Sequence, residues 1–343
     1  LKYAYVSGAV DRATGLGPRL MGGANDYDNE QLSLDAMLSG AWQAWGRRHE
    51  VVLGANWYDR DARSQGGSLP GFGGIPVNVF DFDPAAYADP GAVQWTSDSR
   101  SRTRQYGIYG AARLKLADPL TLLLGGRWSW WRTDSVNQRT GAQTADYRQD
   151  GRFTPYAGLV FDLDSRWSLY TSYADIFRVQ SNYRGEDGGG LPPVVGANYE
   201  AGIKGSLNDG RLQVALAAFR IVESNRAVAV SPVIVDSCCY AAQGKVQSQG
   251  FDAELAGQIA PGWQAMAGYT YNTSEYKRDP SYQGQSFRTF SPRHLLRLWT
   301  TYRLPGALNA WDVGGGINVQ SGTYSEGGKP LVRATQGLSL IHI

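Results

Sequence analysis

Few residues of this chain combine the type and the spacing that enzyme chemistry requires. The 343 residues include only 3 His and 2 Cys. His49 and His294 have no Ser or Cys nucleophile placed with them, so the Ser–His or Cys–His pair of a hydrolase is not indicated. We therefore expect a protein that is not an enzyme.

Two other segments suggest binding chemistry, and the simpler interpretation is favoured for each. Asp81, Asp83 and Asp89 carry the oxygen ligands that calcium prefers, but solvated loop charge explains them, so we predict no metal site. The glycines at 188–190 do not lie between a strand and a helix, as a phosphate-binding loop would.

The 33 basic and 31 acidic residues give a net charge of +2, which predicts no nucleic-acid partner.

The hydropathy of the chain excludes one kind of membrane protein and allows another. Its mean hydropathy is −0.36, and no apolar run approaches the roughly 18 residues that a membrane-spanning helix needs. A transmembrane β-barrel is compatible with this value, because each of its strands shows lipid only at every second residue.

Turns and strands follow the pattern of such a barrel. Short turn signals alternate with long polar stretches, at roughly 10–28, 63–98, 140–150, 182–197, 231–244 and 279–291. Between them, apolar and polar residues alternate with a period of two. In one strand, the side predicted to face lipid holds Leu120, Leu122, Leu124, Gly126, Trp128 and Trp130, and the side predicted to face the lumen holds Thr121, Leu123, Gly125, Arg127, Ser129 and Trp131.

Tryptophans mark one boundary of the predicted membrane. Trp42, Trp167, Trp263 and Trp311 lie on the apolar phase beside short turns, as expected for an aromatic girdle on the periplasmic side. The sequence therefore predicts an all-β fold, an antiparallel up-and-down transmembrane β-barrel, of which about 13 strands are visible.

We expect the barrel to be incomplete. The chain starts within a strand and shows no export signal or closing strand, and bacterial outer-membrane barrels of one chain have an even number of strands. Residues 1–337 are interpreted as a partial barrel. Residues 338–343 depart from the pattern before them and resemble a translated adapter, so we expect a non-native tail there and leave His342 out of any site.

Five segments resemble the ferric-siderophore branch of the TonB-dependent outer-membrane receptors, the branch of the coprogen, ferrioxamine and pyoverdine receptors. They are GRRHEVVLGANW (46–57), TRQYGIYGAARLKLADPLTLLLGGRWSWW (103–131), FTPYAGLVFDLDSRWSLYTSYADIF (153–177), NYEAGIKGSLNDGRLQVALAAFRIVESNRAV (198–228) and RHLLRLWTTYRLPG (293–306). The resemblance implies a barrel of 22 strands around an N-terminal plug domain, with uptake driven through TonB. The plug and the TonB box are not within this sequence.

The resemblance implies a receptor that binds a ferric siderophore, of hydroxamate or mixed type, at its extracellular mouth in the bacterial outer membrane. Fe(III) would be carried as cargo, with no cofactor bound by the protein itself. Expected partners are the siderophore, the TonB complex through the N-terminal region, and outer-membrane lipid. A passive porin remains the alternative, because its interior is equally wet. An outer-membrane hydrolase is the third class of protein considered, and the Ser–His pair that it requires is not seen in the sequence.

Aromatic residues near the predicted mouth are the candidate ligand contacts. Trp131 lies on the lumen phase, and a tilted strand that starts at the turn at 117–119 rises roughly 25 Å across the membrane by this residue, which reaches the outer interface. Arg132 follows it, and the pair resembles a Trp-Arg pair of coprogen-type receptors, although alternation points Arg132 outward unless the strand bulges. The predicted ligand-binding set is Trp131, Arg132, Trp95, Tyr58, Phe177 and Tyr183.

Cys238 and Cys239 are adjacent in a predicted external loop. An oxidising exterior favours a disulfide, but neighbouring Cα atoms lie about 3.8 Å apart, below the usual range for that bond. A strained vicinal disulfide that shapes the loop is the favoured hypothesis, and two free thiols are the alternative.

Overall fold

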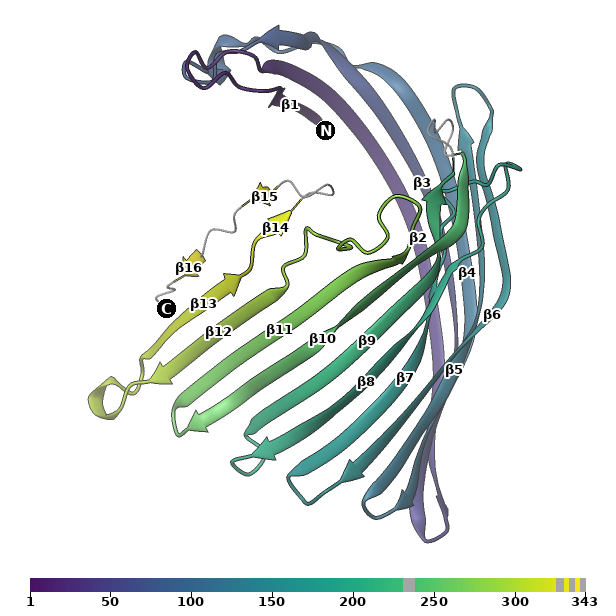
Figure 1. Cartoon of the computed structure of the whole chain (residues 1–343), viewed down its shortest axis with the longest axis vertical. Helices are drawn as coiled ribbons and strands as arrows, with labels where there is room; N and C mark the ends of the chain where they lie inside the picture. The colour runs from purple at the N-terminus through teal and green to yellow at the C-terminus, as the bar shows by residue number, and fades with distance from the viewer. Residues whose placement is uncertain (231–237, 325–329, 333–336, 340–343) are drawn as a thin grey trace. The chain divides into compact units, whose positions relative to one another are not determined.

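A single antiparallel sheet contains nearly all of the strands. The computed structural model describes residues 1–230, 238–324, 330–332 and 337–339. Strands β1 to β13 follow one another in chain order, β16 pairs with β13, and β14 pairs with β15 (Figure 1). The elements are β1 (Lys2–Ser7), β2 (Arg19–Ala44), β3 (Arg47–Pro76), η1 (Pro84–Ala86), β4 (Gln94–Ala117), β5 (Leu120–Asn137), β6 (Gln143–Asp162), β7 (Trp167–Arg178), β8 (Val194–Leu207), β9 (Leu212–Ala229), β10 (Tyr240–Ala260), β11 (Trp263–Arg278), β12 (His294–Arg303), η2 (Gly306–Leu308), β13 (Asp312–Gln320), β14 (Thr323–Tyr324), β15 (Pro330–Val332) and β16 (Gly337–Ser339).

The chain divides into two compact units. Unit 1 comprises residues 1–36, 56–107 and 129–151, and unit 2 comprises residues 37–55, 108–128 and 152–343. Among the described residues, no helix is long and apolar enough to cross a membrane. The predicted all-β class, the antiparallel meander and about 13 strands are therefore confirmed.

Cross-strand register gives the sheet of unit 2 two chemically different faces. Leu216 on β9 pairs with Ala253 on β10, and its neighbour Ala217 pairs with Asp252. Because alternate residues point to opposite faces, this register keeps apolar residues together on one face and polar ones on the other. The apolar face holds Leu169, Ile203, Leu216, Leu255, Leu298 and Ile317, and the wet face holds Tyr170, Glu200, Lys204, Asp252, Glu254 and Arg297.

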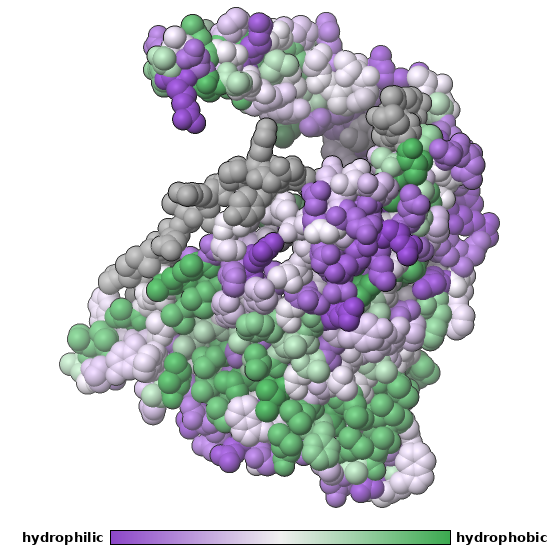
Figure 2. Space-filling view, in the orientation of Figure 1, coloured by the Kyte–Doolittle hydropathy of each residue, from purple (hydrophilic) through white to green (hydrophobic). Residues whose placement is uncertain are grey.

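The apolar face is exposed to the surroundings. Leu169, Leu216, Leu296 and Ile317 are large hydrophobic residues with exposed side chains, and hydrophobic residues gather over the strands of unit 2 in Figure 2. An exposed apolar band of this extent is unfavourable in water and suited to hydrocarbon.

Tight turns are stabilised by short-range hydrogen bonds. After β6, the backbone N–H groups of Arg166 and Trp167 donate to the Asp164 carboxylate over 2.7 and 2.9 Å. These donors hold the pKa of Asp164 below its ordinary value. After β8, Asn208 and Asp209 adopt left-handed backbone angles, which Asn and Asp tolerate better than most residues.

Several polar stretches predicted as loops are instead strand. β3 continues to Pro76, β4 starts at Gln94 and β6 starts at Gln143, so the predicted 63–98 loop shrinks to residues 77–93. These segments lack the apolar phase by which membrane strands are recognised. Between β3 and β4, polar contacts to Asp98 join the extended strands, from Arg63 at 2.6 Å and from the Gln65 side-chain amide at 3.0 Å.

Two arginine substitutions on neighbouring residues of β9 test the assignment of the faces. Leu216→Arg places a charge on the apolar face, and we expect a loss of about 2–4 kcal/mol of folding free energy in lipid. Ala217→Arg is the matched control, because residue 217 faces Asp252 on the wet side. Equilibrium unfolding of the full-length protein in lipid vesicles measures both variants. An equal cost for the two substitutions would contradict the assignment.

Candidate functional site

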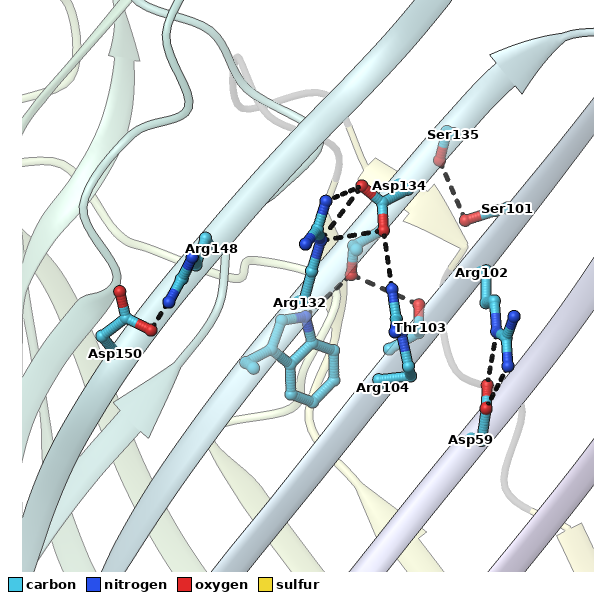
Figure 3. A network of polar contacts seen from close by, with 12 residues as sticks. Asp59, Ser101, Arg102, Thr103, Arg104, Arg132, Asp134, Ser135, Arg148 and Asp150 are labelled. Atoms are coloured by element: carbon cyan, nitrogen blue, oxygen red, sulfur yellow. Dashed lines mark hydrogen bonds and ion pairs between the residues drawn. The ribbon is translucent and has the colours of Figure 1, made fainter.

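One face of unit 1 carries a ladder of ion pairs, here called the ion-pair face. Arg102 contacts Asp59 at 2.6 Å, Arg100 contacts Asp61 at 2.8 Å, and Arg63 contacts Asp98 at 2.6 Å. Each pair lies two residues further along β3 and two residues earlier along the antiparallel β4 than the pair before it, so all of these side chains share one face of the sheet. Figure 3 shows the Arg102–Asp59 pair and its neighbours on β5 and β6.

The opposite face carries neutral hydroxyl groups and is here called the hydroxyl face. Ser101 and Ser135 are joined by a hydrogen bond of 2.9 Å, and the hydroxyls of Thr103 and Thr133 lie 3.3 Å apart. The indole N–H of Trp131 donates to the Thr133 hydroxyl over 2.8 Å. This bond fixes the ring of Trp131 on the hydroxyl face.

Tyr58 shares the hydroxyl face with Trp131. It lies between Trp57 and Asp59 on β3, and Asp59 belongs to the ion-pair face, so alternation directs Tyr58 to the other side. Its hydroxyl lies 3.5 Å from Oε1 of Gln31. Unit 1 therefore brings two of the predicted ligand contacts, Tyr58 and Trp131, to the same face.

Arg132 lies on the ion-pair face. Its guanidinium contacts the Asp134 carboxylate at 3.1 Å, and Arg104 of β4 contacts the same carboxylate at 3.5 Å. Trp131, Thr133 and Ser135 alternate with these residues along β5, so the strand has no bulge that would bring Arg132 to the side of Trp131. The two members of the predicted Trp-Arg pair point to opposite faces, and a ligand role for Arg132 stays a prediction.

Trp95 lies at the start of β4 and not in a loop. The Arg139 side chain donates to its backbone carbonyl over 2.8 Å, and the Trp95 side chain is 38% exposed. The ring is thus accessible, and the backbone of Trp95 is bonded to the turn between β5 and β6.

The remaining two predicted contacts belong to unit 2. Phe177 on β7 pairs with Val195 and follows the phase of Leu169, which is the apolar phase. Tyr183 lies in the connection after β7, where its ring meets that of Tyr240 edge-on with centroids 4.7 Å apart. Tyr183 is 39% exposed and so accessible to a ligand.

A buried glutamine anchors the connection that carries Tyr183. Gln180 is 7% exposed. Its amide N–H₂ donates to the Asn225 carbonyl over 2.6 Å and to the Pro192 carbonyl, and its side-chain oxygen accepts from the N–H of Ala227 over 3.1 Å. These three hydrogen bonds satisfy the buried side-chain amide, so the connection has a defined conformation.

The two cysteines adjoin the same connection. Their Sγ atoms are joined as a vicinal disulfide in the structure, and the Tyr240 N–H donates to the Arg184 carbonyl over 2.9 Å. The segment 231–237, which precedes the cysteines within the predicted external loop, lies outside the described residues.

A basic pocket in unit 2 was missed by the sequence analysis. Its volume is about 340 Å³, and its lining includes Arg288 and Arg293 but no carboxylate. Arg293 donates to the Ser286 hydroxyl over 2.9 Å, and the guanidinium of Arg226 lies 4.5 Å from the centre of the buried Phe287 ring. The sequence RTFSPRH at 288–294 could have indicated this pocket, because it contains two arginines. The search for ligand contacts started from aromatic residues, so most of this segment was interpreted only as a polar loop.

Both histidines of the strands have structural partners. His49 is fully buried, with its Nε2 at 3.0 Å from the Ala44 carbonyl and its Nδ1 accepting from the Lys115 N–H at 3.3 Å. His294 Nδ1 lies 2.8 Å from the Tyr269 hydroxyl. None of these ring contacts is with a Ser or Cys side chain.

The acidic segment after β3 uses its carboxylates in local bonds. Asp83 accepts from the Ala85 N–H at 2.8 Å, and Asp89 accepts from the Gly91 N–H at 2.9 Å. In the part of the chain that the structure describes, no group of three or more His, Cys, Asp or Glu side chains is arranged to hold a metal ion.

The sheet and its two-faced strands agree with one protein family. Residues 1–336 match the family model for the β-barrel of TonB-dependent receptor-like proteins, and the chain therefore belongs to this family. This is a family of receptors and not of enzymes. The predicted family and location in the outer membrane are confirmed.

The most similar proteins include ferric-pyoverdine receptors. The chain is 38% identical over 339 residues to the ferric-pyoverdine M114 receptor of Pseudomonas sp. strain M114, covering 94% of this chain and 40% of that receptor. It is 38% identical over 308 residues to the ferripyoverdine receptor of Pseudomonas aeruginosa, covering 87% of this chain and 36% of the receptor.

A solved structure of a pyoverdine receptor has the same fold. The crystal structure of the P. aeruginosa outer-membrane ferripyoverdine receptor bound to ferripyoverdine matches 98% of this chain and 44% of the receptor chain, with a TM-score of 0.80 and 32% identity. The chain thus spans less than half the length of these pyoverdine receptors.

The vicinal disulfide predicts a simple mass difference. Intact or peptide mass spectrometry of the protein without reductant is expected to give a species two hydrogen masses lighter than after reduction. A Cys238→Ser variant serves as the control, because it has no neighbouring thiol to oxidise and its mass is expected to be unchanged by reductant. Two alkylatable thiols in the unreduced wild-type protein would contradict the disulfide.

Proposed function

We propose that the protein is an outer-membrane receptor that binds a ferric siderophore of the pyoverdine class at its extracellular mouth and imports it with energy coupled through TonB. The observation that carries this proposal is the match of nearly the whole chain to the barrel of ferric-pyoverdine receptors. Because the chain covers about two fifths of those receptors, import is proposed for the whole protein.

The hydroxyl face supplies groups suited to such a ligand. A ferric siderophore presents oxygen atoms and flat organic groups, which aromatic rings and hydrogen-bond donors recognise. Trp131, held by Thr133, offers a rigid ring, and Tyr58 adds a second ring with a hydroxyl on the same face. Iron stays within its siderophore, and the protein contributes contacts to the ligand and not to the metal.

The basic pocket adds charge complementarity. A siderophore with carboxylate groups is attracted by Arg288 and Arg293, whose pocket has no lining carboxylate to neutralise them. We propose this pocket as a contact for such a ligand within unit 2, separate from the hydroxyl face of unit 1.

A passive porin is the second candidate. The wet face of unit 2 carries charges of both signs, among them Lys204, Glu254 and Arg297, and charged side chains of this kind also line channels. The two functions differ in their energy source, since diffusion through a porin needs no coupling to the inner membrane.

Uptake of iron-loaded pyoverdine by an iron-starved host separates the two candidates. We expect cells that express the full-length protein to accumulate radioactive iron from ferric pyoverdine, and deletion of TonB to abolish the accumulation. The host without the receptor gives the background. Uptake that persists without TonB would favour the porin, and no uptake of any siderophore in a panel would remove the receptor proposal.

Trp131→Ala tests the hydroxyl face as a ligand surface. We expect weaker binding of ferric pyoverdine, by roughly tenfold, because loss of a buried aromatic contact costs on the order of 1–2 kcal/mol. Fluorescence quenching of the ligand measures the affinity. Trp128→Ala on the other phase of β5 is the matched control and is expected to bind like the wild type. If the Trp131 variant binds ferric pyoverdine as tightly as the wild type does, the role of Trp131 is purely structural.

A further inference from the structure

Two connections of unit 2 meet at the end of the sheet opposite the tight turns. The first joins β7 to β8 and spans residues 179–193, and the second joins β9 to β10 and ends with Cys238 and Cys239. In an outer-membrane barrel, connections at this end face the outside of the cell. Tyr183 of the first connection is a predicted ligand contact, but the disulfide of the second has no role in the function proposed above.

The first connection has a defined backbone structure. Arg184 forms an antiparallel bridge with Gly190, and the N–H of Leu191 donates to the Tyr183 carbonyl over 3.4 Å. The buried side-chain amide of Gln180 bonds the base of the connection to β9. The side chain of Leu191 is itself buried. The backbone of Tyr183 therefore has a fixed position, and a neighbouring group can orient its ring.

That neighbouring group is the ring of Tyr240. The two tyrosine rings meet edge to face, with centroids 4.7 Å apart and an interplanar angle of 66°. Edge-to-face contact is a preferred geometry for aromatic pairs and stabilises them beyond simple burial. Tyr183 remains 39% exposed, so part of its ring is accessible to a ligand. The direction of this ring thus depends on where the chain places Tyr240.

Contacts on both sides of the disulfide place Tyr240. The Cys239 carbonyl accepts from the N–H of Val230 over 3.0 Å, next to the end of β9. The Sγ atom of Cys238 lies 3.6 Å from a carbonyl oxygen of the first connection. The N–H of Tyr240 donates to the Arg184 carbonyl over 2.9 Å. The cysteine pair is therefore joined to β9 on one side and to the first connection on the other.

The covalent bond restricts the chain between these contacts. A disulfide between neighbouring residues closes a small ring that includes the peptide bond between them, so rotations of both side chains and of the intervening backbone are lost. Two free thiols retain these rotations and would have to give them up to make the same contacts, at a cost in conformational entropy. Reduction should therefore loosen Tyr240 and, through it, the ring of Tyr183.

We propose that the disulfide between Cys238 and Cys239 positions a binding site formed by the rings of Tyr183 and Tyr240, and that this site takes a flat conjugated group of the ferric siderophore. The inference rests on the function proposed above. Aromatic rings with an accessible face bind flat conjugated groups by stacking. The disulfide acts on binding through the tyrosine pair, so both cysteines are positioning residues.

Hydrogen exchange of the full-length protein without ligand tests the positioning step. Dithiothreitol breaks the S–S bond and leaves two thiols, while the reductant is itself oxidised to a disulfide. We expect reduction to increase deuterium uptake in peptides that cover residues 179–193 and 238–244, because the bond from Tyr240 to Arg184 then opens more often. Unchanged uptake in the wild type would overturn the proposal.

A variant that lacks both thiols is the control for the reductant. Cys238→Ser combined with Cys239→Ser keeps side chains of similar size but forms no bond. It is expected to show the higher deuterium uptake of the reduced wild type, whether or not dithiothreitol is added. An increase that dithiothreitol still produces in this variant would come from another part of the protein and would contradict the role of these cysteines.

The affinity for ferric pyoverdine tests the binding step. Radioactive iron in the complex measures binding, after the dithiothreitol has been removed under nitrogen so that it does not act on the iron. We expect reduction to weaken binding by roughly threefold to tenfold, which is the factor that an aromatic contact contributes. In Tyr183→Ala reduction is expected to have no further effect, because the positioned ring is absent. Tyr183→Phe keeps the ring and is expected to respond as the wild type does.

The outcomes separate this inference from the proposed function. If the oxidised wild type bound no member of a panel of ferric pyoverdines, the proposed function would fall, and the siderophore contact with it. Binding that reduction leaves unchanged would overturn this inference alone. An equal loss on reduction in the wild type and in Tyr183→Ala would do the same. Migration of unheated samples in a denaturing gel shows whether each variant forms a folded barrel, so a loss of binding can be told from misfolding.

Discussion

A backbone in hydrocarbon has no water to satisfy its N–H and C=O groups, and this constraint shapes the whole chain. Antiparallel neighbours pair these groups along every strand from β1 to β13, in simple chain order. Once the backbone is satisfied in this way, side chains are free to differ on the two faces. The apolar face of unit 2 and its charged wet face are the direct consequence, since one meets lipid and the other meets water.

In unit 1, the same strand geometry separates two chemically different faces. The hydroxyl face presents Trp131 on a neutral background of Ser and Thr, while the ion-pair face presents arginines paired with aspartates. Because adjacent residues point in opposite directions, Trp131 and Arg132 of β5 belong to different faces although they are neighbours in the sequence. The proposed siderophore contacts Trp131 and Tyr58 therefore lie on one face of unit 1, and the paired arginines lie on the other.

Much of the fold was predictable from the sequence, because alternation with a period of two is a local signal. The strand phases and the number of strands were predicted correctly, whereas the lengths of β3, β4 and β6 were not. The Arg63–Asp98 ion pair joins the extensions of β3 and β4, and its two residues are far apart in sequence. The basic pocket was missed for the same reason, since Arg293 meets Ser321 only after the chain has crossed two strands. The direction of Arg132 followed from alternation, but its partners Asp134 and Arg104 required the register of β4 and β5.

The account depends most on the two-sided character of the strands, and site-directed spin labelling along β10 measures it directly. Single labels at residues 251 to 256 of the full-length protein in lipid vesicles report collisions with oxygen, which enters hydrocarbon, and with a nickel chelate, which stays in water. We predict high oxygen accessibility at Phe251, Ala253 and Leu255, and low oxygen accessibility at Asp252, Glu254 and Ala256. Oxygen accessibility that does not alternate, or that alternates in the opposite phase, would contradict the account.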